Sequence, residues 1–507
     1  MITRTLVVLH RWLGVGLCGF FLLWFLSGIG MMYTTFPEVT AGDRLQRARA
    51  LERASIRLSP QDAYAALGIA QPPSRVRLST FDGRPAYRFE TDGVESVVYA
   101  DTGEEPGPVS RAMMDRAASA WTGQPASTAT IARLDRVDQW TVSEAYRSLE
   151  PLWKYAWPDG QQVYVSEASG EVVQYTTAAA RLRAYLGPIP HWLYFTPLRA
   201  RATWWTRVVT WASALGALAA ALGLAVGARV FSPSRRYRPE GWASRLPYRG
   251  LKRWHAAIGL CAGVGALTWS VSGLPSMEPF PLGVEDPRAP AAVAGADIAR
   301  AVIRLPPLAA FAEKGPRRAL DELAGLPVQE LEFRGLAGQA FYLATLAGGD
   351  TRVVPIAGAV QSGFDADHIL AMALGNSPRH DVAATALLTQ YDRYYLDRRR
   401  QRPLPVVLVR MADPHRTRYY IDPRTARLVG AYRAQNWATR WLYHGLHSLD
   451  FPWLYNHRPL WDIVVVTWML GGAALSATSV VLAWNVVVRG LAENFRKSSD
   501  STTPTGA

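Results

Sequence analysis

Four long apolar runs interrupt an otherwise polar chain, and they predict four membrane-spanning helices. The first run, residues 12–33, contains no charged residue, and at about 1.5 Å per residue it can cross a hydrocarbon core roughly 30 Å thick. It is too long for the apolar region of a signal peptide, so we interpret it as a retained helix. The other runs are residues 208–230, 256–277 and 463–488.

The charges beside these runs predict their orientation. The segment between the second and third runs, SPSRRYRPEGWASRLPYRGLKR, holds seven basic residues and one glutamate. Short loops with this bias stay in the cytoplasm. Both termini would then be cytoplasmic, and the two long polar segments would lie on the other side of the membrane.

The two external segments alternate apolar and polar residues over short stretches, as in RVRLSTF, AYRFETDG and LEFRGLAGQAFYLATL. Alternation of period two that ends in glycine turns predicts antiparallel strands. The stretch SPQDAYAALG before the first strands predicts a short helix capped by Ser59 or Asp62. We therefore expect each external segment to form a small α+β unit, with one sheet packed on a helix.

The two halves of the chain resemble each other. A constant shift of 245 positions aligns His10 with His255, and a shift of 256 aligns His191 with His447; each shift also aligns tryptophans. The unit of helix, external domain, histidine-bearing segment and helix thus occurs twice in the same direction. This pattern predicts an internal two-fold repeat about an axis along the membrane normal.

The expected fold is therefore a membrane α-helical protein with four transmembrane helices and two α+β extracytoplasmic domains. The expected helices are residues 1–33, 204–231, 254–277 and 461–488. The expected external domains are 34–200 and 278–455, and the cytoplasmic parts are the basic loop 232–253 and the tail 489–507.

Composition narrows the possible functions. The mean hydropathy of −0.01 requires large water-exposed parts beside the membrane helices. The net charge of +14 is concentrated in short segments next to apolar runs, which indicates topology rather than a nucleic-acid partner. Cys18 and Cys261 are the only cysteines and both lie in apolar runs, so a disulfide framework is excluded.

Four of the nine histidines occupy equivalent depths in the predicted membrane region. His10 and His255 each lie 17 residues before a Ser-Gly pair, and His191 and His447 each lie 14 residues before the tryptophan that opens the next helix. The duplication thus predicts two pairs of imidazoles, one near each membrane surface. His368, His380, His415 and His457 show no metal-ligand spacing, and we expect them on the surface.

Two facing neutral imidazoles suit the axial positions of a low-spin haem between packed helices. Arg11, Arg199 and Arg201 are close enough in sequence to pair with haem propionates. His444 lies one helical turn from His447, and it could be a ligand, a hydrogen-bond donor to a ligand, or a contact to an acceptor. The alternative for any one of these histidines is a helix anchor or a hydrogen-bonded core residue.

Several stretches resemble one known family. They are HRWLG…WFLSGIGMMY, IPHWLYFTPLR, RWHAAIGL…TWSVSGLPSMEPF and WLYHGLHSLDFPWLYNHRPLWD, together with the turns ADTGE and SEASGEVV. The chain is similar over nearly its whole length to the PepSY-associated transmembrane proteins, also called iron-regulated membrane proteins, which include ferrioxamine-type siderophore reductases. It departs from the family pattern at Ala256, where many relatives carry a second histidine.

The resemblance implies a bacterial inner-membrane protein with PepSY-like periplasmic domains. It also implies two haem b groups, with His10, His191, His255 and His447 as ligands and His444 as an alternate. It implies an oxidoreductase that passes electrons to a periplasmic ferric chelate. No nucleotide-binding fingerprint follows a strand, so the donor would be external, either membrane quinol or a cytoplasmic reductase. Two other functions stay open: a non-enzymatic PepSY protein that regulates or senses a periplasmic peptidase, and a transporter built from repeats.

Overall fold

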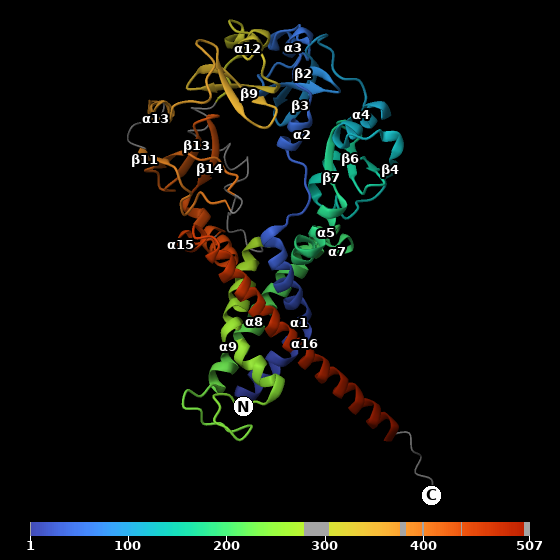
Figure 1. The fold of residues 1–507 in the computed structure, drawn as a ribbon, viewed down its shortest axis with the longest axis vertical. Helices are drawn as coiled ribbons and strands as arrows, with labels where there is room; N and C mark the ends of the chain where they lie inside the picture. The colour runs from blue at the N-terminus through green and yellow to red at the C-terminus, as the bar shows by residue number, and fades with distance from the viewer. Residues whose placement is uncertain (1, 278–303, 376–381, 398–399, 438, 501–507) are drawn as a thin grey trace.

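The computed structural model describes residues 2–277, 304–375, 382–397, 400–437 and 439–500. A bundle of long helices carries β-sheets at one end, and both ends of the chain lie at the other (Figure 1). We call these ends the sheet side and the termini side.

Four helices are long and apolar enough to cross a membrane, so the chain is a multi-pass membrane protein embedded in a lipid bilayer. They are α1 (Ile2–Tyr33), α8 (Ala202–Val230), α9 (Gly250–Gly273) and α16 (Leu460–Asp500). These helices confirm the four predicted spans. The third span was expected to run to Met277, but the α-helix ends at Gly273 and gives way to the 3-10 turn η4 (Leu274–Met277). Pro275 explains the change, because it has no backbone N–H to continue the helix.

The bundle is closed, because α1 packs on α8 and α16, and α9 packs on the same two helices. Small residues allow the close approach of α8 to its neighbours. A Cβ at Gly216 would lie 3.0 Å from the Phe21 ring, and a Cβ at Gly227 would lie 2.9 Å from the Leu260 side chain. Glycine at such contacts is usual where helices pack in a membrane.

One sheet on the sheet side is built from both halves of the chain. Its strands, in spatial order, are β10 (Thr351–Pro355), β9 (Gln339–Leu346), β8 (Val328–Leu336), β1 (Arg75–Phe81), β2 (Arg84–Thr91) and β3 (Val94–Tyr99). All neighbours are antiparallel, and β1 pairs with β8 so that Arg77 lies opposite Glu332. We call this the shared sheet.

Each half also contributes a four-stranded antiparallel sheet with its strands in sequence order. The first contains β4 (Thr130–Leu134), β5 (Leu152–Ala156), β6 (Gln162–Ser166) and β7 (Val172–Thr176). The second contains β11 (Val382–Leu388), β12 (Val406–Met411), β13 (Arg418–Asp422) and β14 (Arg427–Tyr432). The expectation of one sheet in each external segment was therefore wrong: each segment enters two sheets, and one of them crosses between the halves.

Short helices cover the sheets. They are α2 (Ala41–Arg47), α3 (Pro60–Ala65), α4 (Arg111–Thr122), α12 (Pro316–Glu322) and α13 (Ala366–Gly375), with the 3-10 turns η1 (Arg53–Ser55), η2 (Ala126–Thr128), η3 (Glu144–Leu149), η5 (Leu308–Phe311) and η6 (Ala434–Asn436). Ser59 caps α3, because its hydroxyl accepts from the Asp62 N–H at 3.1 Å. The core of the shared sheet is aromatic, with Phe311 packed on Phe333 and Tyr342.

Short helical segments join each half to the membrane bundle. In the first half these are α5 (Ala178–Leu186), α6 (Pro188–Trp192) and α7 (Thr196–Arg199), which lead into α8. In the second half they are the π-helix η7 (Thr439–Gly445), α14 (Leu446–Ser448) and α15 (Pro452–Tyr455), which lead into α16. His191 and His447 lie on these connecting segments, at the sheet side of the bundle.

Candidate functional site

The first histidine pair, His10 and His255, lies at the termini side of the bundle. The two ring centres are 6.2 Å apart, and the ring planes are inclined by 41°. His10 Nδ1 lies 3.0 Å from the Ala219 carbonyl oxygen on α8, and His255 Nδ1 lies 3.1 Å from Thr478 Oγ1 on α16. Each imidazole is thus held by a hydrogen bond with a neighbouring helix.

The second histidine pair, His191 and His447, lies at the sheet side. Its ring centres are 6.1 Å apart, with 66° between the planes. His191 Nδ1 is 3.3 Å from Ser27 Oγ, and His447 Nδ1 is 3.1 Å from Ser272 Oγ. The two Ser-Gly pairs that mark equal depth in the sequence thus place their serines in direct contact with the histidines.

The two pairs are well separated along the bundle. Ser27, which contacts the second pair, lies 17 residues after His10 on α1. At 1.5 Å per residue this corresponds to about 25 Å. The structure therefore brings the four predicted histidines together as two pairs in opposite halves of the membrane region.

The ring separations in both pairs fit a shared metal ion. An imidazole nitrogen lies about 2 Å from a bound first-row metal ion, and the centre of its ring lies about 1 Å beyond that nitrogen. Two rings on opposite sides of one ion therefore have centres roughly 6 Å apart. The observed separations, 6.2 and 6.1 Å, match this value. Hydrogen bonding through the other ring nitrogen is also usual for metal-binding histidines, because it fixes the ring orientation.

A pocket of about 360 Å³ lies against the second pair, and all four membrane helices contribute to it. This volume is in the range of small-molecule sites, and the lining is mostly apolar and aromatic. Besides both histidines, the lining includes Phe21, Phe25, Trp269, Tyr443, Trp461 and Met469. Such a pocket suits the face of a flat apolar macrocycle.

Arg199 is buried beside this pocket without a hydrogen-bond partner for two of its nitrogens. Its side chain is 9 % exposed, and neither Nε nor Nη1 has a partner among the described residues. The guanidinium stacks 5.1 Å from the ring of Tyr194 and 4.6 Å from the ring of Trp205, and both aromatic residues line the pocket. An unpaired buried cation at this position suits a carboxylate such as a haem propionate.

The other two arginines expected near propionates are placed differently. Arg11 and Arg201 are exposed, and Arg11 stacks 5.5 Å from the exposed Trp12 ring. Only Arg199 of the three predicted arginines is buried beside the pocket.

His444 does not have the α-helical relation to His447 on which its expected role depended. It lies in the π-helix η7, whose wider turn changes the faces of residues three positions apart. Its ring lies 4.9 Å from Tyr443, and the Tyr443 ring in turn stacks 5.4 Å from His447. Tyr443, rather than His444, lines the pocket.

Three residues near the first pair were not found from the sequence. Thr478 and Ser479 approach His255 Nδ1 at 3.1 and 3.4 Å, and a Cβ at Gly223 would lie 2.6 Å from His10 Cε1. The glycine belongs to the run of small residues in α8, which signals a close contact but does not identify the partner.

The remaining histidines do not join these sites. His368, His415 and His457 are exposed, which confirms the expectation for them, and His380 lies outside the described residues. Within the described ranges, no group of three or more His, Cys, Asp or Glu side chains could hold a metal ion.

Comparison with known proteins identifies one family. The sequence profile of the PepSY-associated TM region matches residues 7–349, which is more than half of the chain. This range includes His10, His191, His255 and Arg199, and it ends before His447. No curated protein matches the chain.

Proposed function

This chain belongs to the PepSY-associated transmembrane family, and from that premise we propose that it is a membrane reductase that contains two haem b groups. It would pass electrons from a donor at the termini side to a ferric siderophore or another ferric chelate at the sheet side. The observation that carries this proposal is the presence of two facing imidazole pairs at opposite ends of one membrane bundle.

The proposed ligands are His10 and His255 at the first site, and His191 and His447 at the second. When bound, haem supplies a one-electron iron couple whose potential depends on its ligands, its burial and its hydrogen bonds. The hydrogen bonds at Nδ1 orient the four imidazoles, and a haem bound in the second pocket would contact a mostly apolar lining.

Arg199 is proposed to hold a propionate at the second site. Its two unpartnered nitrogens lie in a buried environment, where an uncompensated cation is costly, and a carboxylate would remove that cost. Arg11 and Arg201 receive no such role, because both are exposed.

We further propose that the protein lies in the bacterial inner membrane, with both termini in the cytoplasm and the sheets in the periplasm. The basic loop between α8 and α9 supports this orientation, because it lies at the same end of the bundle as the N-terminus (Figure 1). The electron donor would then be membrane quinol or a cytoplasmic reductase.

The internal two-fold repeat is also a proposal, and two details related by the shift of 256 positions support it. Leu193 and Leu449, each two residues after its histidine, both have a positive φ, at 53° and 50°. The indole nitrogens of Trp205 and Trp461 both donate to the carbonyl of the residue that follows the histidine.

The test is the haem content of the purified full-length protein in detergent. The reduced-minus-oxidised spectrum should show b-type bands with two haem groups per chain. His255→Ala and His447→Ala should each retain about one. His457→Ala is the matched control, because this histidine is exposed, and it should retain both.

Two outcomes would contradict the proposal. A colourless protein after haem supplementation would exclude the reductase function and favour a regulatory PepSY protein or a transporter. A His255→Ala variant that still held two haem groups would show that the ligand assignment at the first site is wrong.

A further inference from the structure

A large cleft lies on the sheet side, remote from both histidine pairs. Its volume is about 1280 Å³, and it is bounded by α2, β1, α4 and the turn before β7, with residues of β8 and β14 from the other half. The cleft therefore lies where the shared sheet joins the two halves of the chain.

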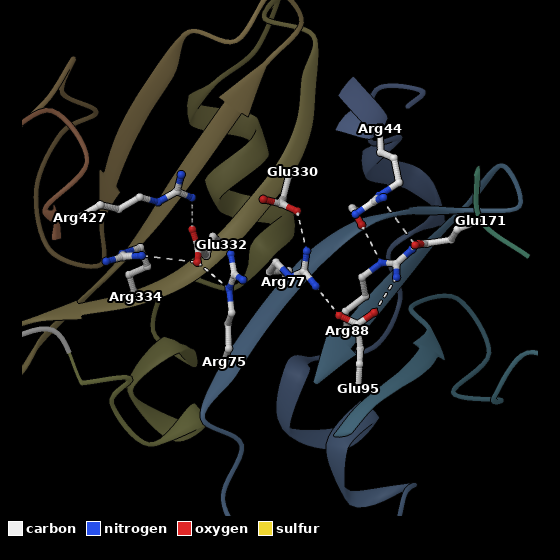
Figure 2. Close-up of polar contacts among 11 residues, drawn as sticks. Arg44, Arg75, Arg77, Arg88, Glu95, Glu171, Glu330, Glu332, Arg334 and Arg427 are labelled. Carbon is white, nitrogen blue, oxygen red and sulfur yellow. Dashed lines mark hydrogen bonds and ion pairs between the residues drawn. The ribbon is translucent and has the colours of Figure 1, made fainter. Parts of the chain in front are cut away.

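The shared sheet presents a charged face in this region, opposite its aromatic core. At the β1–β8 seam, Val76 and Leu78 enter the core, while Arg75 and Arg77 alternate with them on the other face. Figure 2 shows these arginines among glutamates of both halves. Eight arginines and five carboxylates line the cleft, so positive charge is in excess.

The glutamates of the seam are already neutralised by arginines. Glu332 forms ion pairs with Arg75, Arg334 and Arg427 (Figure 2). Burial alone would raise the pKa of Glu332, but the three guanidiniums outweigh it and lower this pKa to about 2. Glu332 therefore stays ionised at neutral pH, and its carboxylate pairs with Arg75 and Arg427 of the cleft lining, so these two arginines do not contribute unpaired charge.

Arg47 and Arg49 carry the unpaired charge of the cleft. Neither side chain forms an ion pair within 4 Å with a carboxylate of the described residues. Arg47 is nevertheless held in place, since its guanidinium stacks 4.4 Å from the ring of Trp121 and 5.6 Å from that of Tyr175. The indole Nε1 of Trp121, also in the cleft lining, is buried and has no acceptor among the described residues.

We propose that this cleft binds a small anion with several carboxylate or phosphate oxygens. Guanidinium groups recognise such oxygens in bidentate fashion, and an N–H donor without a partner adds a further point of recognition. Stacking on aromatic rings orients Arg47 before the ligand arrives, which reduces the entropy lost on binding. The inference goes beyond the proposed reductase function, and its test requires no haem.

Isothermal titration calorimetry on the full-length protein in detergent, at low salt, tests the proposal with three probes: citrate, ferric citrate and inorganic pyrophosphate. At least one probe should bind saturably, and raised ionic strength should weaken it. Tighter binding of ferric citrate than of citrate would identify an iron-loaded chelate as the source of the anion. Equal binding would identify the free anion.

The decisive comparison uses the Arg47→Gln/Arg49→Gln double variant, in which affinity should fall at least tenfold. Arg57→Gln is the matched control, because this exposed arginine lies outside the cleft lining, and its affinity should not change. The single Arg49→Gln variant, at an exposed position, should weaken binding partially. It keeps the proposal testable if the double variant does not fold. Absence of saturable binding to the unmodified protein, or equal affinity in the double variant and Arg57→Gln, would overturn the proposal.

Discussion

The hydrogen bond at Nδ1 orients each paired imidazole, and at His255 its side-chain hydroxyl partners can be removed without changing the ligand itself. Thr478 and Ser479 supply the hydroxyls near this nitrogen. A Thr478→Val/Ser479→Ala variant should lower haem affinity at the first site about tenfold, as loss of such supporting contacts commonly does at metal sites.

Haem dissociation, followed by transfer to an apo-globin acceptor, measures this loss. Ser476→Ala is the control on the same helix, because the Ser476 hydroxyl donates to its own helix at Gly472. An unchanged dissociation rate in the double variant would contradict the role given to the two hydroxyls.

Arg199 should have opposite effects in the haem-free and haem-loaded protein. In the haem-free protein Arg199→Met removes a buried, incompletely bonded charge and should raise the melting temperature. In the loaded protein it removes a positive charge that favours ferrous iron, so the midpoint potential of the second haem should fall by roughly 60 mV, a tenfold change for one electron.

Thermal melting and a spectroscopic redox titration test the two halves of this prediction. Arg201→Gln alters an exposed neighbour and should change neither quantity. A lower melting temperature for the haem-free Arg199→Met protein would show that this guanidinium has a partner in the unloaded state.

The positions of the four histidines could be predicted from the sequence because the duplication repeats them at equal distances from other landmarks. The different burial of Arg199 and Arg201 could not. Arg199 ends the short helix α7 and Arg201 precedes α8, so their exposure depends on how the chain turns between two helices. Local pattern does not determine that turn.

At the scale of the helices, the contact between α1 and α8 at the first histidine pair leaves no room for a side chain. A Cβ at Gly223 would lie 2.6 Å from His10 Cε1. Gly223→Ala should therefore displace the His10 ring and remove the first haem, while the second remains.

Haem stoichiometry of the variant, measured beside Gly14→Ala, checks this expectation. Gly14 lies on the same helix as His10, and a Cβ there would meet no atom within 4 Å. Retention of both haem groups in Gly223→Ala would mean that the ring can move without losing its ligand function.

The apolar runs were sufficient to predict the membrane helices, because a bilayer imposes a length and a composition on any helix that crosses it. They were not sufficient to predict the π-helix that carries His444. The seven residues of η7 are too few for their apolar pattern to distinguish a π-helix from an α-helix.

At the scale of the whole molecule, the seam of the shared sheet should make stability depend on pH. The pKa of Glu332 is about 2, below its ordinary value of 4.5. A carboxyl group whose pKa is lowered by folding stabilises the folded state above about pH 4.5. At 1.36 kcal/mol per pKa unit the contribution is about 3 kcal/mol, and it is lost as the pH falls toward 2.

Glu332→Gln should remove much of that pH dependence and lower the melting temperature at pH 7, because three arginines lose their carboxylate. Melting curves from pH 7 to pH 3 measure both effects. Glu105→Gln, at an exposed position, should behave as the unmodified protein. Parallel pH profiles for Glu332→Gln and the unmodified protein would contradict the assignment.

Alternating residues predicted the strands, but the pairing of β1 with β8 between the two halves was not predictable from them. Alternation specifies which face of a strand is buried and leaves its neighbour undetermined. The β1–β8 pairing, in which Arg77 lies opposite Glu332, joins segments that are far apart in the sequence. It connects the two external domains that were expected to be separate.

The shared sheet also has a mechanical consequence for the membrane part. Each half continues from its own four-stranded sheet into one histidine of the second pair, through α6 in one case and α14 in the other. The pairing of β1 with β8 joins the two halves at the end of the sheet side that lies farthest from the membrane bundle. We therefore expect the separation of His191 and His447 to depend on the β1–β8 pairing, although that pairing lies far from the membrane bundle.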